Sequence, residues 1–321
     1  MENIRRVTSK MKYAIMGSGG TGGCIGGYLA NTGCDVTMIA RGKHLKAIKE
    51  KGLTLETSEK GTFNLKIKAC GAEEYKDKAD VIFVCVKYYS VDEAVEFIKK
   101  ASHKYTVVIP ILNVFGTGAY IQEKVGALTV TDGCVYIYSF IKEYGVIAKP
   151  SDIFKVYFGL REGQDKKALP ILERVKEDLA KSGIEPYLSH NIKKDTFRKF
   201  TYISPVASAG LYCNATAGDF IKEGEARTIL IALTEELLAL GKAMGIEYRE
   251  DMVQTNLDII AGLKPDADTS MQRDIAKGNK SEIEGLLHQI VRWGKEYNVP
   301  MPTYEMVSYK YKKLKKGGGC L

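Results

Sequence analysis

The sequence predicts an α/β domain built on a doubly wound parallel sheet, followed by a domain made of helices alone. Up to about residue 188, short apolar strands alternate with amphipathic helices, which is typical of a parallel sheet covered on both faces. Beyond that point, helical periodicity continues to Lys316. A chain of 321 residues is long enough for two cores, and we expect domains over residues 12–188 and 189–316.

The first domain is expected to combine main strands and helices with extra short strands. Apolar runs predict strands at 12–16, 35–39, 80–86 and 105–111, and amphipathic segments predict helices at 20–32, 43–51, 90–101 and 116–124. Residues 53–69 resemble short strands with a turn at Glu59–Gly61. Residues 128–160 look extended and hairpin-like, so we expect the later half of the sheet to be antiparallel. A helix over 166–181 then ends at Gly183.

The second domain is expected to contain long helices over 191–212, 224–244, 248–262 and 279–297. Asn191 suits the N-cap of the first helix, Gly245 ends the second, and a turn at Lys264–Asp266 follows the third. Ligands commonly bind at domain interfaces, so we expect the substrate in the cleft between the two domains.

The first strand runs directly into a glycine-rich loop with a small-residue helix behind it. In a Gly-x-Gly-x-x-Gly loop, the first glycine makes a tight turn and the second lets the backbone approach a pyrophosphate. The third lets the helix pack against the strand, and the helix N-terminus offers free N–H groups to the phosphates. This context predicts a Rossmann-type domain with a dinucleotide held by Gly17, Ser18, Gly19, Gly20, Thr21 and Gly22.

The end of the second strand indicates which dinucleotide binds. Sites that prefer NAD place Asp or Glu there to bind the ribose 2′-hydroxyl, whereas this strand ends in Met-Ile-Ala-Arg41. The planar donors of Arg41 suit a 2′-phosphate, Lys43 follows closely, and Lys87 closes the strand at 80–86. The alternative is that all three are ordinary solvated cations. Because the acid is missing, we expect NADP(H) as the cofactor.

Composition limits the partners and the compartment. The chain is 45% hydrophobic and 27% charged, which is ordinary for a globular protein, and no apolar run reaches the length of a membrane span. Met1–Arg6 lacks the apolar core of a signal peptide, so we expect a cytoplasmic protein with no membrane partner. The net charge of +8 lies partly in the run Lys310–Lys316, and the other cations alternate with acids. We therefore expect no nucleic-acid partner, although a basic surface suits anionic substrates.

Cysteines and histidines give no sign of a metal or disulfide site. The seven cysteines show no metal-type spacing. Cys24 and Cys85 are interpreted as small core residues, and Cys320 as an exposed thiol near the end of the sequence. The four histidines form no recognisable catalytic arrangement, and we interpret all of them as structural or solvated.

Lys199 is the strongest candidate for proton transfer. In helical spacing it shares a face with Ile203, Val206, Ala207 and Gly210. An ammonium group on an apolar stripe loses hydration, which lowers its pKa and makes it a better proton donor. The alternative is a lysine that snorkels from the edge of the stripe. Since no histidine is suitable, a hydride-transfer enzyme with this sequence needs a lysine to protonate the developing alkoxide.

Three further residues are weaker candidates. Glu282 precedes a core stripe that begins at Ile283, but Asn279-Lys-Ser-Glu282 also matches a capping box, which would explain the acid without any substrate. Asn113 directly follows an apolar strand, at the carboxyl end where open α/β sheets border their ligand crevice. Ser270 carries no signal of its own.

These residues together resemble the ketopantoate reductase (2-dehydropantoate 2-reductase) family, from about Lys12 to Lys313. The more specific matches are Phe197-Arg-Lys199-Phe, and Thr269–Ile275 followed by Ser281–Ile283. Further matches are the glycine loop, Ala40-Arg41, Val84–Lys87 and Leu112–Gly116, where Val114 replaces a glycine of the family's turn. The resemblance implies a Rossmann-type domain and an all-α domain of the 6-phosphogluconate-dehydrogenase-like kind.

The resemblance also implies a reaction, the NADPH-dependent reduction of 2-dehydropantoate to pantoate on the route to pantothenate and coenzyme A. By that resemblance, Lys199 protonates the C2 oxygen while the cofactor delivers hydride, and Glu282 positions the lysine and contacts substrate or cofactor. Asn113 lies between nicotinamide and substrate, and Ser270 binds the substrate carboxylate.

Cofactor contacts and assembly follow from the same resemblance. Arg41 and Lys87 hold the 2′-phosphate of NADPH. The helical domain is the surface that family analogy suggests for a homodimer.

One departure leaves the substrate open. The family commonly has asparagines four and eight residues after the lysine, where this chain has Ile203 and Ala207. Either the adjacent Ser204 and Ser208, or Asn214, replace those contacts, or the substrate is a different, less hydroxylated 2-oxo acid, as for an opine or hydroxy-acid dehydrogenase. A third possibility is a non-catalytic NADP-binding sensor, which needs neither the lysine nor the glutamate.

Overall fold

The computed structural model describes the backbone of residues 10–316 and the side chains through residue 312. Within these residues, unit 1 comprises 10–112 and Gly116–Asp195, and unit 2 comprises Asn113–Phe115 and 196–316. The boundary predicted between residues 188 and 189 stays a prediction, because compactness alone does not define where an independently folding domain ends. Met1–Arg6 and Cys320 lie outside the described residues.

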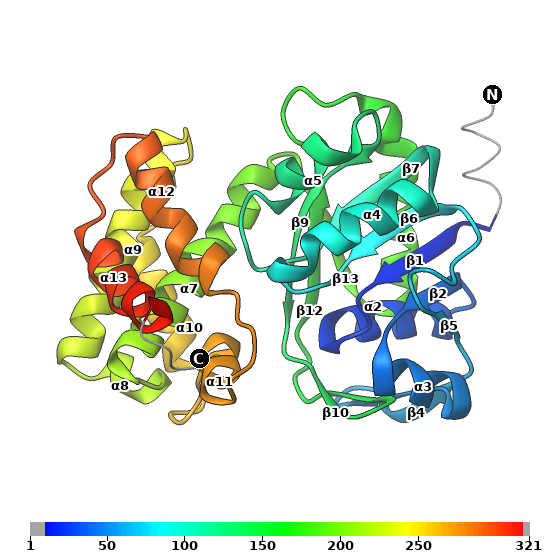
Figure 1. Cartoon of the computed structure of the whole chain (residues 1–321), viewed down its shortest axis with the longest axis horizontal. Coiled ribbons are helices and arrows are strands. Elements are labelled where there is room, and N and C mark those ends of the chain that lie inside the picture. The colour runs from blue at the N-terminus through cyan, green and yellow to red at the C-terminus, as the bar shows by residue number, and fades with distance from the viewer. Residues whose placement is uncertain (1–9, 317–321) are drawn as a thin grey trace. The chain divides into compact units, whose positions relative to one another are not determined.

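Unit 1 is built around a six-stranded sheet in the order β5-β2-β1-β6-β7-β8, with every neighbouring pair parallel (Figure 1). Its strands are β1 (Lys12–Met16), β2 (Asp35–Ile39), β5 (Lys68–Cys70), β6 (Ala79–Val84), β7 (Ser102–Pro110) and β8 (Thr129–Val130). The α-helices of this unit are α2 (Gly20–Asn31), α3 (Gly42–Lys51), α4 (Val91–Ala101), α5 (Thr117–Val125) and α6 (Leu169–Ser182). Together with the helical unit 2, this confirms the predicted fold class.

The alternation of side chains along β1 explains the two helical layers. Tyr13 and Ile15 belong to a core that they share with α2 and α6, whereas Ala14 and Met16 belong to a core shared with α4 and α5. Successive side chains of a strand point to opposite faces, so both faces of the sheet are buried. This double burial is why its strands appear as continuous apolar runs in the sequence.

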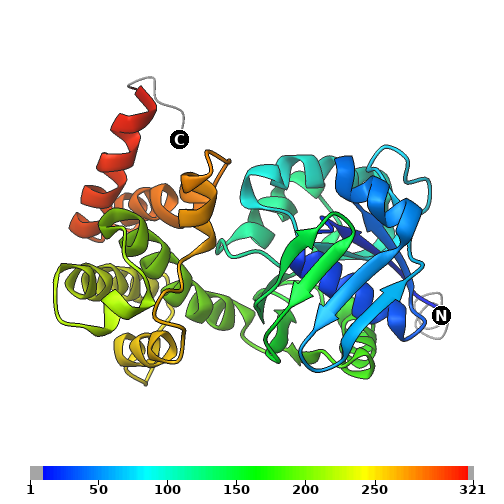
Figure 2. The ribbon, with the colours of Figure 1, turned by 90° about the horizontal axis from the view of Figure 1, so that it is seen from below.

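The expectation that the later half of this sheet is antiparallel is wrong. The crossover through α5 returns β8 parallel to β7 and so occupies that edge. The antiparallel pairs lie in two smaller sheets, β10-β11-β3-β4 and β13-β12-β9. Their strands are β3 (Leu53–Thr57), β4 (Gly61–Leu65), β9 (Asp132–Ile137), β10 (Phe140–Glu143), β11 (Val146–Lys149), β12 (Phe154–Gly159) and β13 (Glu185–Leu188). Figure 2 shows the green hairpin of β10 and β11 beside the blue strands β3 and β4.

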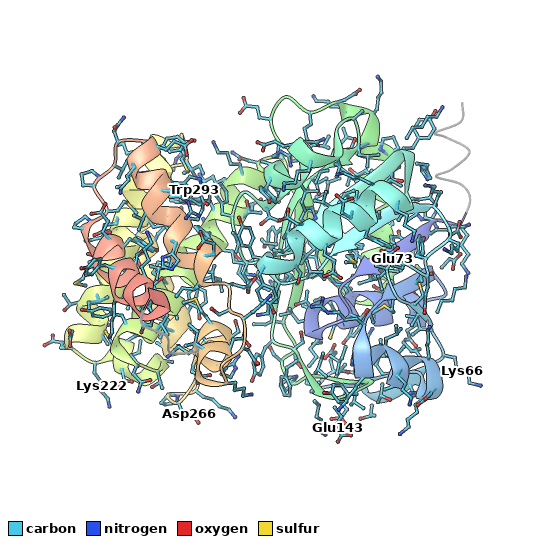
Figure 3. The ribbon with its side chains drawn as sticks, in the orientation of Figure 1. Lys66, Glu73, Glu143, Lys222, Asp266 and Trp293 are labelled. Carbon is cyan, nitrogen blue, oxygen red and sulfur yellow. The ribbon has the colours of Figure 1, made fainter. Side chains whose placement is uncertain are left out.

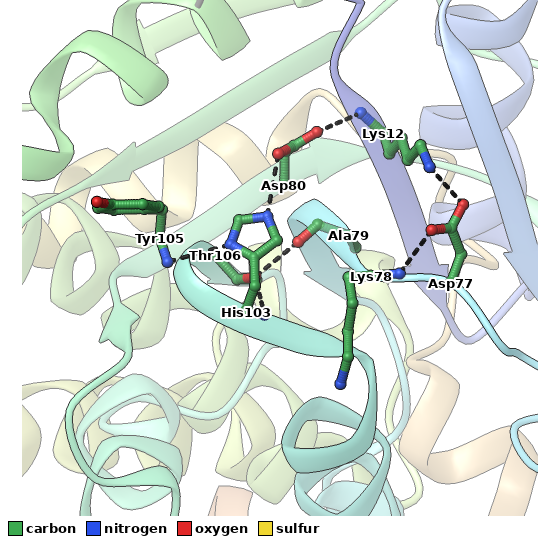
Figure 4. A network of polar contacts seen from close by, with 8 residues as sticks. All are labelled: Lys12, Asp77, Lys78, Ala79, Asp80, His103, Tyr105 and Thr106. Carbon is green, nitrogen blue, oxygen red and sulfur yellow. Dashed lines mark hydrogen bonds and ion pairs between the residues drawn. The ribbon is translucent and has the colours of Figure 1, made fainter. Parts of the chain in front are cut away.

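A polar network ties together the amino ends of β1, β6 and β7 (Figure 4). The main-chain N–H of Lys12 donates to Asp80 at 2.9 Å, and the other carboxylate oxygen of Asp80 lies 3.1 Å from His103 Nε2. The Tyr105 N–H donates to His103 Nδ1 at 3.1 Å. His103 therefore has a structural role, in line with its interpretation from the sequence.

Unit 2 consists of helices, the first of which, α7, begins in unit 1. The helices are α7 (Ile192–Cys213), α8 (Ala217–Ile221), α9 (Glu225–Ala243), α10 (Met252–Ala261), α11 (Ser270–Ala276), the π-helical turn η3 (Glu284–His288), α12 (Gln289–Glu296) and α13 (Pro302–Lys316). The side chain of Asn191 accepts the Lys194 N–H at 3.1 Å, which confirms the predicted N-cap. The short helices α8 and α11 were not predicted, because they span only 5 and 7 residues.

Surface charges on unit 1 are mixed in sign. Lys66 and Glu143 project from the rim of unit 1 in Figure 3, and the Glu73 side chain is 96% exposed. An exposed ion pair joins Lys12 to Asp77 at 2.7 Å. Between residues 10 and 316, no helix is long and apolar enough to cross a membrane.

Candidate active site

The glycine loop connects β1 to α2, and its glycines have different surroundings. Gly17 has a φ of +97°, and a Cβ there would lie 2.9 Å from the Cys85 main chain. A Cβ at Gly22 would lie 1.9 Å from the Gly17 carbonyl oxygen. A Cβ at Gly19 would meet nothing within 4 Å. The loop is therefore packed against protein at Gly17 and Gly22 and open at Gly19, where a pyrophosphate needs close access to the backbone.

The N-terminus of α2 has the properties of an anion site. Gly19 is its N-cap and provides no side-chain hydrogen bond, and its first turn carries no acidic residue. The first N–H groups of a helix have no intrahelical partner, and the helix dipole favours negative charge there. The loop and the helix together thus fit the phosphates of a dinucleotide.

The cations that follow the strand ends lie in different settings. Arg41 is the N-cap of α3, with its side chain 74% exposed, and pairs with Glu93 at 2.9 Å. Lys43 Nζ lies 6.0 Å from the centroid of the Tyr144 ring. The strand predicted to run to residue 86 ends at Val84. Half-buried Lys87 lies three residues beyond that end.

His44 links the glycine loop to the β10–β11 hairpin. The Gly145 N–H donates to His44 Nδ1 at 3.1 Å, so the ring is neutral with its proton on Nε2. Burial lowers the pKa of His44, an effect partly offset by the neighbouring main chain of Ser18. The Ser18 hydroxyl in turn donates to the Ile39 carbonyl at 3.1 Å. The loop is therefore held from two sides.

Lys199 and Asn113 meet in unit 2. The amine of Lys199, on α7, donates to the Asn113 side-chain oxygen at 2.8 Å, and Lys199 is only 7% exposed. This lysine does not snorkel to the surface, so that alternative is ruled out. A buried amine that donates to a neutral acceptor is able to pass a proton to a substrate oxygen.

Glu282 is not part of a capping box. The helical segment begins at Ile283, so Glu282 precedes it rather than occupying its first turn. Its main-chain oxygen accepts the N–H groups of Gly285 and Leu286 at 3.0 and 2.9 Å. The side chain is nevertheless buried, with Glu282 4% exposed. A buried carboxylate needs polar partners, and the role predicted for Glu282 stays a prediction.

Ser270 is the first residue of α11, and a neighbouring residue fixes that helix. Thr269 and Gln272 form a capping box, and the Gln272 amide also donates to the carbonyls of Gly210 and Ala215, at 3.0 and 2.9 Å. These bonds attach α11 to the C-terminal end of α7. Gln272 lies inside the segment Thr269–Ile275 that resembles the family, but no pattern in the sequence predicts its contacts with Gly210 and Ala215.

The serines next to Ile203 and Ala207 do not replace the family's asparagines. Ser204 is fully buried and its hydroxyl lies 2.7 Å from both the Leu286 carbonyl and the Tyr304 hydroxyl. Ser208 is also fully buried. Helical rotation of about 100° per residue turns both serines from the Lys199 face into the core of unit 2. That part of the expectation is wrong.

The cysteines of the described segment form no disulfide. Burial raises the pKa of the Cys24 thiol to about 12, and it raises the pKa of Cys85 as well. Cys24 is a core residue, as the sequence indicated, and Cys85 packs against the same core while only partly buried. Between residues 10 and 312, no group of three side chains is arranged to hold a metal ion.

A parallel-sheet unit with an open glycine loop, joined to a helical unit with a buried lysine, defines a Rossmann-type oxidoreductase. Comparison with known families makes this specific. The family profile "Ketopantoate reductase PanE/ApbA" matches residues 13–163, and its C-terminal counterpart matches residues 191–315. The chain belongs to the ketopantoate reductase family, which confirms the resemblance.

Curated relatives match nearly the whole chain at low identity. An uncharacterized oxidoreductase of Bacillus subtilis, YkpB, is 26% identical over 92% of this chain and 96% of its own length. A 2-dehydropantoate 2-reductase of Pyrococcus horikoshii is 27% identical over 91% of this chain and 93% of its own.

Solved structures share the fold. A PanE/ApbA family ketopantoate reductase from Ralstonia eutropha superimposes with a TM-score of 0.84 at 24% identity, over 95% of this chain and 99% of that one. A D-mandelate dehydrogenase, solved with NADH and anilino(oxo)acetate, has a TM-score of 0.84 at 22% identity, over 93% and 96%. At these identities the likeness concerns the fold alone.

Proposed function

We propose that the protein reduces ketopantoate to pantoate with NADPH. The observation that carries this proposal is the Lys199 amine, buried on α7 and bonded to Asn113 at 2.8 Å. A relative such as the Pyrococcus horikoshii protein is named for this reaction, which supports the choice of substrate.

Each part of the candidate site has a separate role in this proposal. The open glycine loop and the uncapped start of α2 fit the pyrophosphate of the cofactor. When bound, the nicotinamide supplies the hydride. Lys199 gives its proton to the C2 oxygen of the substrate, and Asn113 orients the amine. Ser270 binds the carboxylate, and Glu282 helps to hold Lys199.

NADPH is proposed over NADH because of Arg41. Its guanidinium is exposed, and its bond to Glu93 is a surface ion pair of the kind that contributes at most about 1 kcal/mol. A 2′-phosphate competes readily for that guanidinium, since bidentate pairing with phosphate is strong. Lys87 is proposed as the second cation at this phosphate.

A second candidate is the reduction of a 2-oxo acid with an apolar side chain. Ser204 and Ser208 face the core, and Ile203 lies on the Lys199 face, so this face offers fewer polar groups than ketopantoate requires. The fold is shared with a D-mandelate dehydrogenase, whose substrate has an apolar ring. Exposed Asn214, at the end of α7, is the remaining candidate for the missing polar contact.

Steady-state kinetics separate these candidates. The specificity constant for ketopantoate with NADPH is compared with those of aliphatic and aromatic 2-oxo acids. We expect ketopantoate to give the highest value, and a tenfold advantage of another acid establishes the second candidate instead. NADPH binding without oxidation by any acid of the panel identifies a non-catalytic sensor.

The Lys199→Ala variant tests the proton donor. Loss of a general acid lowers kcat by about 100-fold or more, while the Kd for NADPH changes little. The matched control is Lys194→Ala, on the same helix outside the Lys199 face. If Lys199→Ala lowers kcat only slightly, Lys199 is not the general acid.

We also propose a homodimer. A dimeric ketopantoate reductase from Staphylococcus aureus shares the fold, with a TM-score of 0.79 at 20% identity. Light scattering at working concentration measures the mass, and a monomer contradicts this part of the proposal.

A further inference from the structure

The segment Asn113–Phe115 leaves unit 1 and packs as part of unit 2. On one side of it, Leu112 is buried in the core shared with α4 and α5. On the other side, Gly116 has a φ of +78° and is the N-cap of α5 in unit 1. These three residues therefore belong to unit 2, although the chain on both sides of them belongs to unit 1.

The ring of Phe115 is inserted among the aromatic rings of unit 2. Its centroid lies 5.0 Å from that of Phe197, with the ring planes at 80°. It lies 5.9 Å from Phe200 and 6.0 Å from Trp293, which is labelled on α12 in Figure 3. The contacts with Phe197 and Trp293 are edge-to-face, a geometry that is favourable and directional at these distances. We call these four rings the aromatic cluster.

The aromatic cluster and the Lys199 bond share one stretch of α7. Phe197 and Phe200, which are 0% and 1% exposed, flank Lys199 in the sequence. Two residues before Phe115, Asn113 accepts the Lys199 amine at 2.8 Å. The short segment is therefore fixed to α7 at both ends, by a ring at one end and by an amide oxygen at the other. Val114 between them is buried as well.

We propose that Phe115 is a positioning residue that holds the Asn113 oxygen against the Lys199 amine. A lysine side chain has several rotatable bonds, and one hydrogen bond restricts them only if its acceptor is itself fixed. The ring of Phe115 fixes that acceptor. Misplacing a reacting group by about 1 Å is enough to slow an enzyme severely. The consequence for turnover rests on the proposed function of Lys199.

The test uses two substitutions. Phe115→Leu removes the aromatic ring and its contacts, and Phe115→Tyr keeps the ring. The matched control is Phe220→Leu, because Phe220 is a buried ring of unit 2 on α8, outside the aromatic cluster. We expect Phe115→Leu to lower kcat about tenfold or more with the Kd for NADPH within about twofold. Phe115→Tyr and Phe220→Leu should both retain kcat, whatever their melting temperatures.

A double variant tests whether Phe115 acts through Asn113. In an Asn113→Ala background, Phe115→Leu should change kcat by less than about twofold, because the bond that it supports is already absent. If the double variant loses kcat by the product of the two single losses, the proposal is overturned. It is also overturned if Phe220→Leu lowers kcat as much as Phe115→Leu.

A second measurement does not depend on activity. The rate at which acetic anhydride modifies Lys199 is followed by mass spectrometry, and Phe115→Leu should raise it severalfold over wild type and over Phe220→Leu. If wild type reduces no 2-oxo acid but this rate still rises, the proposed function fails and the positioning role stands. An unchanged rate overturns the positioning role itself.

Discussion

Alanine substitutions at Gly22 and Gly19 test opposite sides of the glycine loop. At Gly22 an added Cβ would lie 1.9 Å from the Gly17 carbonyl oxygen, whereas ordinary contact begins at 3.4 Å, so the main chain must move by about 1.5 Å. The same Cβ would also lie 2.9 Å from the Cys85 side chain. Neither neighbour is the flexible end of a long side chain. The strain cannot be relieved without separating α2 from β1.

The magnitude follows from that geometry. Overpacking in a tight core costs about 1–3 kcal/mol, and a clash with main chain belongs at the upper end or beyond. For a unit of this size, about 3 kcal/mol lowers the melting temperature by roughly 6–12 °C. At Gly19 the same methyl group meets nothing within 4 Å, and the φ of −73° is acceptable for alanine. Its effect on stability should be within about 1 kcal/mol.

The assay is differential scanning fluorimetry of both variants, with NADPH affinity measured by fluorescence titration. Gly22→Ala should melt well below wild type. Gly19→Ala should melt near wild type but bind NADPH at least tenfold more weakly, because its methyl group occupies the space that a pyrophosphate needs. A Gly19→Ala variant with unchanged NADPH affinity, or a Gly22→Ala variant as stable as wild type, refutes this account of the loop.

The remaining predictions concern stability, pH and cofactor choice. The lowered pKa of His44 means that the unfolded chain binds more protons below pH 6.5, so the free energy of unfolding falls as the pH drops. His44→Gln should weaken that dependence in urea titrations at about pH 8 and about pH 5, and an unaltered slope contradicts it. Ser204→Ala should lower the free energy of unfolding by about 1–3 kcal/mol, since Tyr304 loses a buried partner, yet leave the specificity constant unchanged. A changed specificity constant would return Ser204 to the substrate site. Arg41→Asp should raise the KM for NADPH far more than the KM for NADH, and an unchanged preference for NADPH refutes the role of Arg41.

Local signals in the sequence were sufficient for much of the fold. The strand that runs into Gly17, the N-cap at Asn191 and the C-cap at Gly183 depend on neighbours within a few residues, and all three are found in the structure. The parallel sheet followed from strands that alternate with helices. The hairpin-like pairing predicted within residues 128–160 is found, as β10 with β11 and β9 with β12. The placement of these strands in two smaller sheets was missed, because it depends on distant partners such as β3 and β13.

The candidate site was only partly accessible to the same reasoning. Lys199 was found through its apolar face, but its acceptor lies 86 residues away in the sequence. Ser204 was misjudged because one residue of helical rotation decides between the Lys199 face and the core. Phe115 was not found at all, since a single aromatic residue after a strand carries no periodic signal.

The sequence by itself determined the class of the fold, the glycine loop and the residue types available for proton transfer. These depend on backbone preferences and on periodicities of a few residues, which any stretch of chain expresses locally. Only the tertiary structure decided which side chains meet. Contacts such as Lys199 with Asn113, or Phe115 with Trp293, arise from packing between segments far apart in the chain, and the free energy of that packing is a property of the folded whole.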